Sequence, residues 1–513
     1  MPCGEPALRD VHETGRPRGG FQRVMDDYQA GVMQMPRVAT RDGNGLDAFF
    51  YPKGIVVAGA SNNPSKAGHQ VLKNLRRANF PGPVYAVNPK EEEILGYKCY
   101  PRLSDVPAGV QLMIVTIPAE SVPELFKEAS AREDIEAAVV LASGFAETGI
   151  PERVHLQEEM ISYAKKAGIR VMGPNCVGVM NTDNKLDTTF APTVKSIPGG
   201  LSVISQSGAL GASLLMFAGD HPVPMGFSKF CHVGNQSDVT VLEVLEYYAQ
   251  DESTKVVGMY LEGVSDGRAF METARKLTGK KPLLVLKVGK SDQGSSAALS
   301  HTGSLAGSDK VYHGAFEQVG AIRVDTIEDL LNAAKALSMQ PLPRGDRICV
   351  LTEAGGPGTI AVDEIATSGA ASLARFSGRT IKELRDCLPA MAMIGKPDGY
   401  ADMSAAATEE QHSRALSCVL ADDGVDAVIV ISVPPTFLSP VKVAEEILAV
   451  AKGSKKPVLV CLMSGEWVRE ARVLLESNGI PTFDMPDQAA RAAVAMVKRG
   501  RYCREMVERG DDR

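Results

Sequence analysis

The 513-residue sequence predicts an α/β protein built from three consecutive doubly wound domains. Two observations lead to this prediction. Short apolar runs alternate with helical stretches through most of the chain, which is typical of parallel sheets with crossover helices. In addition, an apolar run leads three times into a loop of small residues and then into a helix, at 59–61, 205–211 and 353–358. Such loops lie at the carboxyl ends of strands, where doubly wound sheets hold their ligands.

Polar segments and a Pro/Gly-rich stretch at 341–346 divide the chain. The expected segments are an N-terminal extension at 1–46, domains at 47–185, 186–340 and 347–500, and a C-terminal tail at 501–513. The expected strands are 55–58, 84–87, 112–115, 137–141 and 171–172 in the first domain, 201–204, 256–261 and 283–288 in the second, and 348–351, 427–432 and 457–462 in the third.

The composition argues against several classes of function. The net charge of −7 gives no electrostatic case for binding nucleic acid or an anionic membrane surface. Apolar runs stay shorter than the roughly 18–20 residues of a membrane-spanning helix. The nine cysteines include no Cys-x-x-Cys pair, so we expect free thiols in a reducing cytoplasm and no metal site.

Glycine-bearing loops at the strand ends of the first domain indicate a ligand site. The sequence has no Gly-x-Gly-x-x-Gly fingerprint, and its second strand leads to Lys90, where an NAD enzyme would carry a carboxylate. A phosphate-rich nucleotide other than NAD therefore fits better, although the first loop alone would favour a plain strand–helix turn. The candidate cofactor-binding residues are Gly59, Ala60, Ser61, Lys66, Lys90, Ser143, Gly144 and Asn175.

Two similar loops in the second domain, at 205–211 and 300–307, indicate anion sites, because helix N-termini expose free N–H groups. His301, in the second loop, is a candidate phosphoryl acceptor, although most histidines are structural or lie on the surface. Glu262 ends an apolar run and is the candidate to orient that imidazole, with a solvated strand-end glutamate as the alternative. The candidate phosphate-binding residues are Ser205, Ser207, Gly208, Thr302 and Gly303.

Together these motifs resemble the α subunits of NDP-forming acyl-CoA synthetases, within the succinyl-CoA synthetase superfamily. The match runs from about Leu46 to about Arg499. It implies a Rossmann-like CoA-binding domain followed by two flavodoxin-like domains. The first of these is a phosphohistidine domain, and the second carries the glycine loop 355–358 and Asp363.

The resemblance implies the reaction acid + CoA + ATP ⇌ acyl-CoA + ADP + phosphate, through an acyl phosphate and a phosphorylated His301 held by Glu262. The sequence shows neither a P-loop nor an ATP-grasp module. We therefore expect ATP/ADP and Mg²⁺ to bind to a separate ATP-grasp β subunit in a hetero-oligomer. A non-catalytic CoA- or acyl-CoA-binding regulator of the same fold and an NAD-linked oxidoreductase are the alternatives.

Two segments of the third domain depart from the family pattern. Glu353 stands where the family usually carries a small polar residue, and Lys396 opens the segment that replaces Asn-Pro-x-Asp. The resemblance places both near the acyl group, with Gly355 and Gly356. A carboxylate beside an acyl phosphate repels it, so something must offset the repulsion. One candidate is Lys396, and the other is a cationic or hydroxylated acid substrate.

Overall fold

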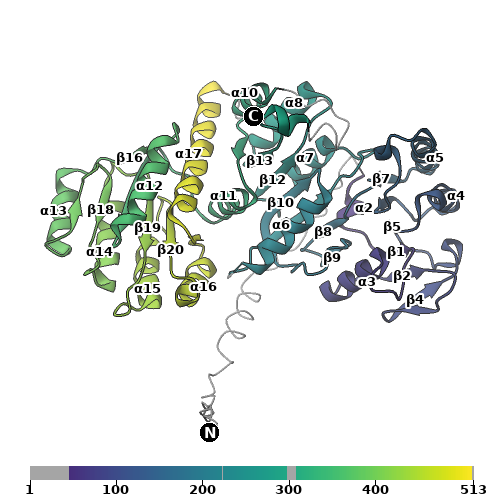
Figure 1. The fold of residues 1–513 in the computed structure, drawn as a ribbon, viewed down its shortest axis with the longest axis horizontal. Helices are drawn as coiled ribbons and strands as arrows, with labels where there is room; N and C mark the ends of the chain where they lie inside the picture. Colours follow the sequence, from purple (N-terminus) through teal and green to yellow (C-terminus); the bar gives the residue numbers. More distant parts are fainter. Residues whose placement is uncertain (1–44, 222, 297–307, 511–513) are drawn as a thin grey trace, which may run out of the picture. The chain divides into compact units, whose positions relative to one another are not determined.

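The computed structural model describes residues 45–221, 223–296 and 308–510. The loop with His301, Thr302 and Gly303 lies outside these ranges, as does the predicted N-terminal extension except for its last two residues. The described residues form three seven-stranded sheets (Figure 1). The predicted α/β class with successive doubly wound domains is confirmed.

The first sheet has the order β3-β4-β2-β1-β5-β6-β7 and is parallel except for the β3–β4 pair. Its central strands are buried along their whole length, because helices cover both faces: α3 packs on one, and α4 and α5 on the other. The strands are β1 Ile55–Ala58, β2 Val84–Val87, β3 Glu93–Ile94, β4 Tyr97–Tyr100, β5 Leu112–Val115, β6 Ala137–Val140 and β7 Arg170–Met172. The helices are α2 Asp47–Phe50, α3 Ala67–Ala78, α4 Val122–Ala129 and α5 Pro151–Ala167.

The second sheet has the order β14-β13-β12-β10-β11-β8-β9. Strand β8 lies in the stretch predicted for the first domain but pairs antiparallel with β11, so the chain enters the second sheet early. The strands are β8 Val179–Asn181, β9 Leu186–Asp187, β10 Pro198–Ser205, β11 Phe227–His232, β12 Val256–Leu261, β13 Leu283–Lys287 and β14 Ile322–Val324. The helices are α6 Gly208–Asp220, α7 Val241–Gln250, α8 Gly267–Thr278, α10 Asp309–Gln318 and α11 Ile327–Met339. Helices α6 and α11 cover one face, and α7 and α8 cover the other.

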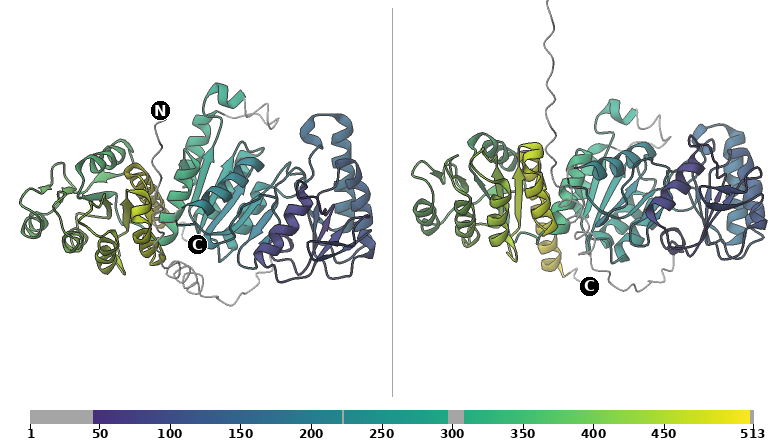
Figure 2. Two further views of the ribbon diagram at one scale, coloured as in Figure 1. Left: turned by 60° about the horizontal axis from the view of Figure 1, so that its bottom comes forward. Right: turned by 90° about the horizontal axis from the view of Figure 1, so that it is seen from below.

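The third sheet has the order β17-β18-β15-β19-β20-β21, with β16 also paired to β15. Helices α12 and α17 pack on one face and α13 to α16 on the other, and Figure 2 shows this layering from two further directions. The strands are β15 Arg347–Thr352, β16 Ser372–Leu373, β17 Met393–Ile394, β18 Tyr400–Asp402, β19 Ala427–Ser432, β20 Val458–Leu462 and β21 Thr482–Phe483. The helices are α12 Gly355–Thr367, α13 Gly378–Cys387, α14 Glu409–Leu420, α15 Pro440–Ala451, α16 Arg469–Ser477 and α17 Pro486–Arg509.

Helix α17 runs without a break into the predicted C-terminal tail, as far as Arg509. It packs against α11 of the second domain as well as on the third sheet. None of the described helices has the length and apolarity that a bilayer span requires.

Backbone hydrogen bonds join the first two domains next to the predicted site. The segment 232–239, which begins at the last residue of β11, runs along the segment 171–178, which begins within β7. The bonds are His232 N to Gly178 O (3.3 Å), Asn235 N to Pro174 O (2.9 Å), Ser237 N to Gly173 O (3.2 Å) and Val239 N to Val171 O (3.0 Å). The approach requires glycine at 234, where a Cβ would lie 2.1 Å from Pro174 O. We call this pairing the domain 1–2 junction.

Candidate active site

The loop after β1 is held in place by backbone geometry. Gly59 has a φ of +89°, and a Cβ there would lie 2.6 Å from Thr116 Oγ1, so only glycine fits. Asn88, just after β2, donates a hydrogen bond from Nδ2 to the Ala60 carbonyl at 2.7 Å. The Ser61 carbonyl lies 3.0 Å from His69 Nδ1. The predicted loop is therefore a fixed turn at the carboxyl ends of β1 and β2.

Three predicted polar residues of the first domain are exposed around this turn. Lys66 is the N-cap residue of α3, Lys90 follows β2, and Ser143 follows β6. They follow β1, β2 and β6 at the carboxyl edge of one sheet, the edge at which doubly wound sheets hold ligands.

The loop at Gly144 and the turn at Asn175 meet through Asn235 of the second domain. The Glu147 carboxylate accepts from Gly144 N at 2.6 Å and from Phe145 N at 3.2 Å. Asn235 Nδ2 donates to the same carboxylate at 2.6 Å, and Asn235 Oδ1 accepts from Asn175 Nδ2 at 3.4 Å. Burial alone would raise the pKa of Glu147, but these hydrogen bonds outweigh it and hold the pKa below its ordinary value.

The first phosphate loop uses its serine hydroxyls to shape itself. Ser205 is buried; its Oγ donates to Ser207 O at 2.6 Å and accepts from Ser207 N at 3.1 Å. Ser207 caps α6 by accepting from Leu210 N at 3.4 Å. The groups left to meet an anion are therefore the first-turn N–H groups of α6, beginning with Gly208.

Glu262 lies beside this loop, as the sequence predicted for a shared site. Its side chain is buried at the end of β12, and its backbone N donates to Gln206 Oε1 at 2.7 Å. Gln206 also bonds both backbone groups of Gly263, accepting from N at 3.2 Å and donating to O at 2.9 Å. The Gln206 side chain therefore connects the backbone turn at residues 262–263 to the phosphate loop by three hydrogen bonds.

Tyr260 lies two residues before Glu262 and on the same face of β12. Burial, followed by the charge of Glu262 and a hydrogen bond to it, raises the pKa of Tyr260 to about 12. The phenol therefore stays protonated beside the carboxylate of Glu262.

The sequence argument missed two buried residues at the carboxyl edge of this sheet. Lys287 ends β13 and is 1% exposed. Its Nζ lies 4.5 Å from the centre of the Tyr312 ring, and burial lowers the pKa of the ammonium group. His232 ends β11 and accepts a hydrogen bond at Nδ1 from Val177 N at 3.0 Å. Lys287 ends the apolar run of β13, which is the signal that identified Glu262 and could have identified Lys287 as well. Strand β11 contains Ser228 and Lys229 and has no such run, so the sequence carries no comparable signal for His232.

In the third domain, Glu353 lies at the end of β15 with its carboxylate buried. The carboxylate accepts hydrogen bonds from Val433 N at 2.6 Å, from Ser432 Oγ at 2.8 Å and from His412 Nε2 at 3.2 Å. Lys396 is exposed, in the segment that leads to β18. The positive partner that the sequence argument sought in Lys396 is therefore supplied by His412, a residue of α14.

His412 is itself fully buried, and its other ring nitrogen, Nδ1, lies 2.9 Å from the Thr408 carbonyl. Burial alone would lower the pKa of His412, but the hydrogen bond and charge of Glu353 outweigh it and raise the pKa above its ordinary value. Both ring nitrogens face oxygen acceptors, which suits an imidazolium that donates twice.

The glycine loop after β15 begins α12. A Cβ at Gly355 would lie 2.9 Å from Asp402 Oδ2, so a larger residue there would displace the Asp402 carboxylate. A Cβ at Gly356 would meet no atom of the described residues within 4 Å. The space in front of the first turn of α12 is open at Gly356.

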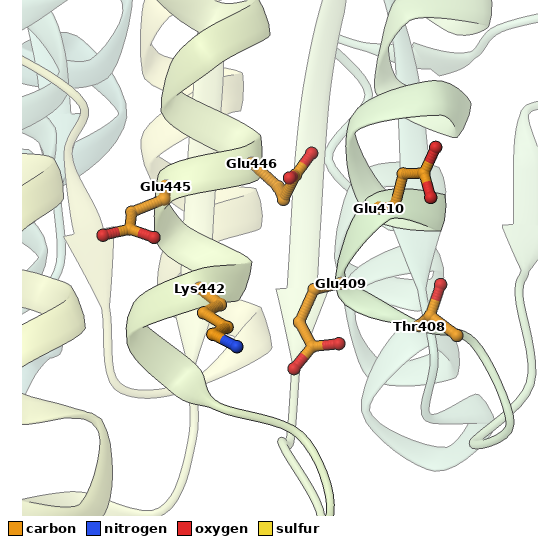
Figure 3. A pocket seen from close by; sticks show the side chains of 6 residues that line it. All are labelled: Thr408, Glu409, Glu410, Lys442, Glu445 and Glu446. Atoms are coloured by element: carbon orange, nitrogen blue, oxygen red, sulfur yellow. The ribbon is translucent and has the colours of Figure 1, made fainter.

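A separate hollow of about 500 Å³ lies between α14 and α15 (Figure 3). Its lining carries four carboxylates and one ammonium group; the residues are Thr408, Glu409, Glu410, Lys442, Glu445 and Glu446. This excess of negative charge is unsuited to phosphate or carboxylate ligands, and the hollow contains none of the predicted site residues.

Comparison with known proteins agrees with this geometry. Residues 53–182 match the model of a CoA binding domain, and residues 198–337 match that of a succinyl-CoA ligase-like flavodoxin domain. The chain is 43% identical over 460 residues to the α subunit of acetate–CoA ligase [ADP-forming] II from Pyrococcus furiosus, covering 89% of this chain and 98% of that protein.

A second relative, acetate–CoA ligase [ADP-forming] I from Archaeoglobus fulgidus, is 40% identical over 89% of this chain, which spans 64% of that longer protein. Among solved structures, the dinucleotide-forming acetyl-coenzyme A synthetase 1 of Candidatus Korarchaeum cryptofilum, with phosphate and ADP, matches with a TM-score of 0.83. The two are 35% identical, over 91% of this chain and 99% of that one. This chain therefore belongs to the family of α subunits of ADP-forming acetate–CoA ligases.

Proposed function

We propose that this chain is the subunit of an acid–thiol ligase that carries the phosphohistidine and binds CoA. The reaction is acid + CoA + ATP ⇌ acyl-CoA + ADP + phosphate. The observation that carries the proposal is the clamp at Gln206, which holds the turn of Glu262 against the N-terminus of α6. A buried carboxylate beside an anion-binding helix start suits the transfer of a phosphoryl group to a histidine.

In this proposal His301 accepts the phosphoryl group and Glu262 orients its imidazole. A carboxylate that accepts from the imidazole N–H fixes the tautomer and stabilises the charged ring that forms on phosphorylation. Tyr260 presents a protonated phenol beside this carboxylate. In this proposal the first-turn N–H groups of α6 bind the phosphoryl oxygens, and the hydroxyls of Ser205 and Ser207 hold the loop in shape. Thr302 and Gly303 are further candidates for phosphate binding.

The polar groups at the carboxyl edge of the first sheet fit CoA. Lys66 and Lys90 provide cations for its phosphates, and Ser143 and Asn175 provide hydrogen-bonding groups. The turns at Gly59 to Ser61 and at Gly144 allow close approach of a ligand to the backbone. When bound, CoA supplies the thiol that attacks the acyl phosphate.

The acyl phosphate is assigned to the start of α12, at Gly355 and Gly356. The open space at Gly356 supports this assignment, because its N–H group is accessible at the start of a helix of 13 residues. Lys396 remains a candidate at the rim of this site.

ATP, ADP and Mg²⁺ are assigned to a separate ATP-grasp β subunit in a cytoplasmic hetero-oligomer. The Pyrococcus furiosus relative, which this chain covers almost end to end, is named an α subunit, and this supports a partner. The scattered cysteines favour a reducing compartment.

The test is co-expression with an ATP-grasp partner, followed by an assay of a panel of small acids for acyl-CoA and ADP. With acyl-CoA and labelled phosphate, the chain should acquire an acid-labile, base-stable label. His301→Ala should abolish the label, whereas His155→Ala, at an exposed position on α5, should keep it. CoA binding without label or turnover would point to a non-catalytic CoA-binding protein. A label that survives His301→Ala would refute the acceptor.

A further inference from the structure

Lys287 and Tyr312 bring together the two ends of the segment that carries His301. Lys287 is the last residue of β13, which precedes that segment, and Tyr312 lies in the first turn of α10, which follows it. Both residues are buried, with 1% and 8% of their surface exposed. The Nζ atom of Lys287 lies 4.5 Å from the centre of the Tyr312 ring, which is within the range of a cation–π contact.

The hydroxyl group of Tyr312 reaches the turn of Glu262. Its oxygen accepts a hydrogen bond at 3.2 Å from the backbone N of Val264, two residues after Glu262. Gln206 of the phosphate loop bonds the same turn at the backbone of residues 262 and 263. The turn 262–264 is therefore held from two directions, by the phosphate loop and by the helix that follows His301.

Other contacts fix the place of the Tyr312 ring. Asp309, the first residue of α10, accepts two hydrogen bonds from Arg323 of β14, from Nη1 at 3.0 Å and from Nη2 at 2.6 Å. The Tyr312 ring also packs on the Phe316 ring, with 5.9 Å between the ring centres. Because the start of the helix and both neighbours of the ring are set, the hydroxyl has a defined place beside Val264 N.

Such a contact matters for an imidazole that is oriented by a carboxylate. In the proposed function, the Glu262 carboxylate has to meet the His301 ring at hydrogen-bond distance, about 2.6–3.2 Å. A misplacement of about 1 Å in a catalytic pair can cost roughly 10²-fold in rate. The two residues come from different segments of the chain, so their distance depends on what joins those segments.

We propose that Tyr312, held by Lys287, is a positioning residue that sets the distance between the His301 segment and the Glu262 carboxylate. The Lys287 ammonium holds the ring where β13 ends, and the hydroxyl of the ring holds the turn of Glu262. This inference rests on the proposed function and adds to it two residues that position the reacting groups without contacting them.

Two substitutions each remove one part of this arrangement. Tyr312→Phe removes the acceptor of Val264 N and keeps the ring beside the ammonium group. Lys287→Met removes the ammonium group and keeps an unbranched side chain that fills the same space. Tyr163→Phe on α5 and Lys276→Met on the exposed face of α8 are the matched controls.

Each variant is assayed in the complex with the β subunit, for the single-turnover rate of phosphohistidine formation and for the CoA dissociation constant by calorimetry. We expect Tyr312→Phe to slow phosphorylation roughly tenfold, because one buried hydrogen bond to the turn is lost. Lys287→Met should slow it by a similar factor of roughly ten, because the ring loses its cation. CoA affinity should stay at the wild-type value in both variants, since neither residue lies in the first domain. The two controls should change neither quantity.

The double variant tests whether Lys287 acts through Tyr312. If it does, the two effects overlap, and the double variant should be no more than roughly threefold slower than the slower single variant. Effects that multiply, to roughly a hundredfold loss, would overturn the role given to Lys287.

A lower unfolding midpoint with an unchanged phosphorylation rate would overturn the positioning role, and so would equal losses of phosphorylation rate and CoA affinity. The wild-type complex tests the contact without substitution, because the Val264 N–H group should be protected from hydrogen exchange. Exchange as fast as in an unstructured peptide would overturn the inference even if a variant failed to fold. A wild-type complex that forms no phosphohistidine would overturn the proposed function, whereas wild-type rates in both single variants would overturn this inference alone.

Discussion

Replacing Glu353 should reveal a buried ion pair that matters to the stability of the third domain. Its carboxylate is 1% exposed and the His412 ring 0% exposed, with Nε2 3.2 Å from Oε2. Ser432 Oγ and Val433 N donate to the other oxygen at 2.8 and 2.6 Å. Glu353→Ala removes the acceptor of all three donors, and leaves a buried imidazole without its counter-charge.

The expected magnitude follows from this geometry. Loss of one partner of a buried ion pair costs about 3–5 kcal/mol, because the remaining charge stays desolvated. Glu353→Gln keeps an acceptor for Ser432 and Val433 and offers an N–H group to a neutral His412. Its cost should be that of a weakened hydrogen bond, about 1 kcal/mol.

The pair also predicts a dependence on pH. Glu353, and to a smaller extent Glu409, raise the pKa of His412 against the effect of burial. A raised histidine pKa adds stability that is fully present below the unfolded pKa of about 6.5 and is lost as pH rises through the folded value. The difference between wild type and Glu353→Gln should therefore shrink at alkaline pH.

Urea unfolding followed by circular dichroism, from pH 6 to pH 9, tests these expectations. Glu383→Gln, on the exposed face of α13, is the matched control and should stay within about 0.5 kcal/mol of wild type. A cost below about 1 kcal/mol for Glu353→Ala would refute the ion pair. So would an unchanged pH dependence in Glu353→Gln.

Three further predictions concern other parts of the structure. Glu262→Gln should lower the rate of phosphohistidine formation by roughly 10²-fold and leave CoA affinity unchanged. Tyr260→Phe should lower the same rate by about tenfold. Rates equal to that of wild type in rapid-quench assays would count against both roles. Gly208→Ala should lower the free energy of unfolding by about 1–3 kcal/mol, because the new Cβ would lie 2.8 Å from Val177 Cγ2. Gly267→Ala is the control: a Cβ at Gly267 would meet no atom of the described residues within 4 Å, so this variant should be as stable as wild type. The hydrogen bond from His221, followed by the charge of Arg472, lowers the pKa of Asp484 to about 2. The stability that this carboxylate contributes is therefore present above about pH 3.9 and is lost as the pH falls toward about 2. In Asp484→Asn, the free energy of unfolding should depend less on pH in that window.

Features that depend on local pattern could be predicted from the sequence. The apolar runs 256–261 and 427–432 coincide with β12 and β19, because fully buried parallel strands read as continuous apolar segments. Glu262 was expected over the crevice because it ends a buried strand, and its backbone N is bonded to Gln206 of the Ser205 loop.

Features that depend on distant partners could not be predicted. His412 lies 59 residues after Glu353, within a helical pattern, and nothing local marks it as the counter-charge of a strand-end glutamate. Strands β8 and β9 have two or three residues each and include buried Asn181 and Asp187, so they lack an apolar run. Strand β8 enters the second sheet by antiparallel backbone pairing with β11, and such pairing leaves little trace in side-chain composition.

That junction has a consequence for engineering the protein. Side chains reinforce the main-chain hydrogen bonds between the segments 171–178 and 232–239: Arg170 pairs with Asp238 and Glu243, and Asn235 donates to Glu147. These residues therefore have to be kept together when the segments diverge. Chimaeras that graft the first domain of a relative onto this chain should therefore assemble correctly when the partners of Asn235, Asp238 and Glu243 are kept, together with glycine at 208 and 234. Substrate-side loops could then be exchanged as a module, with the phosphoryl-transfer half left untouched.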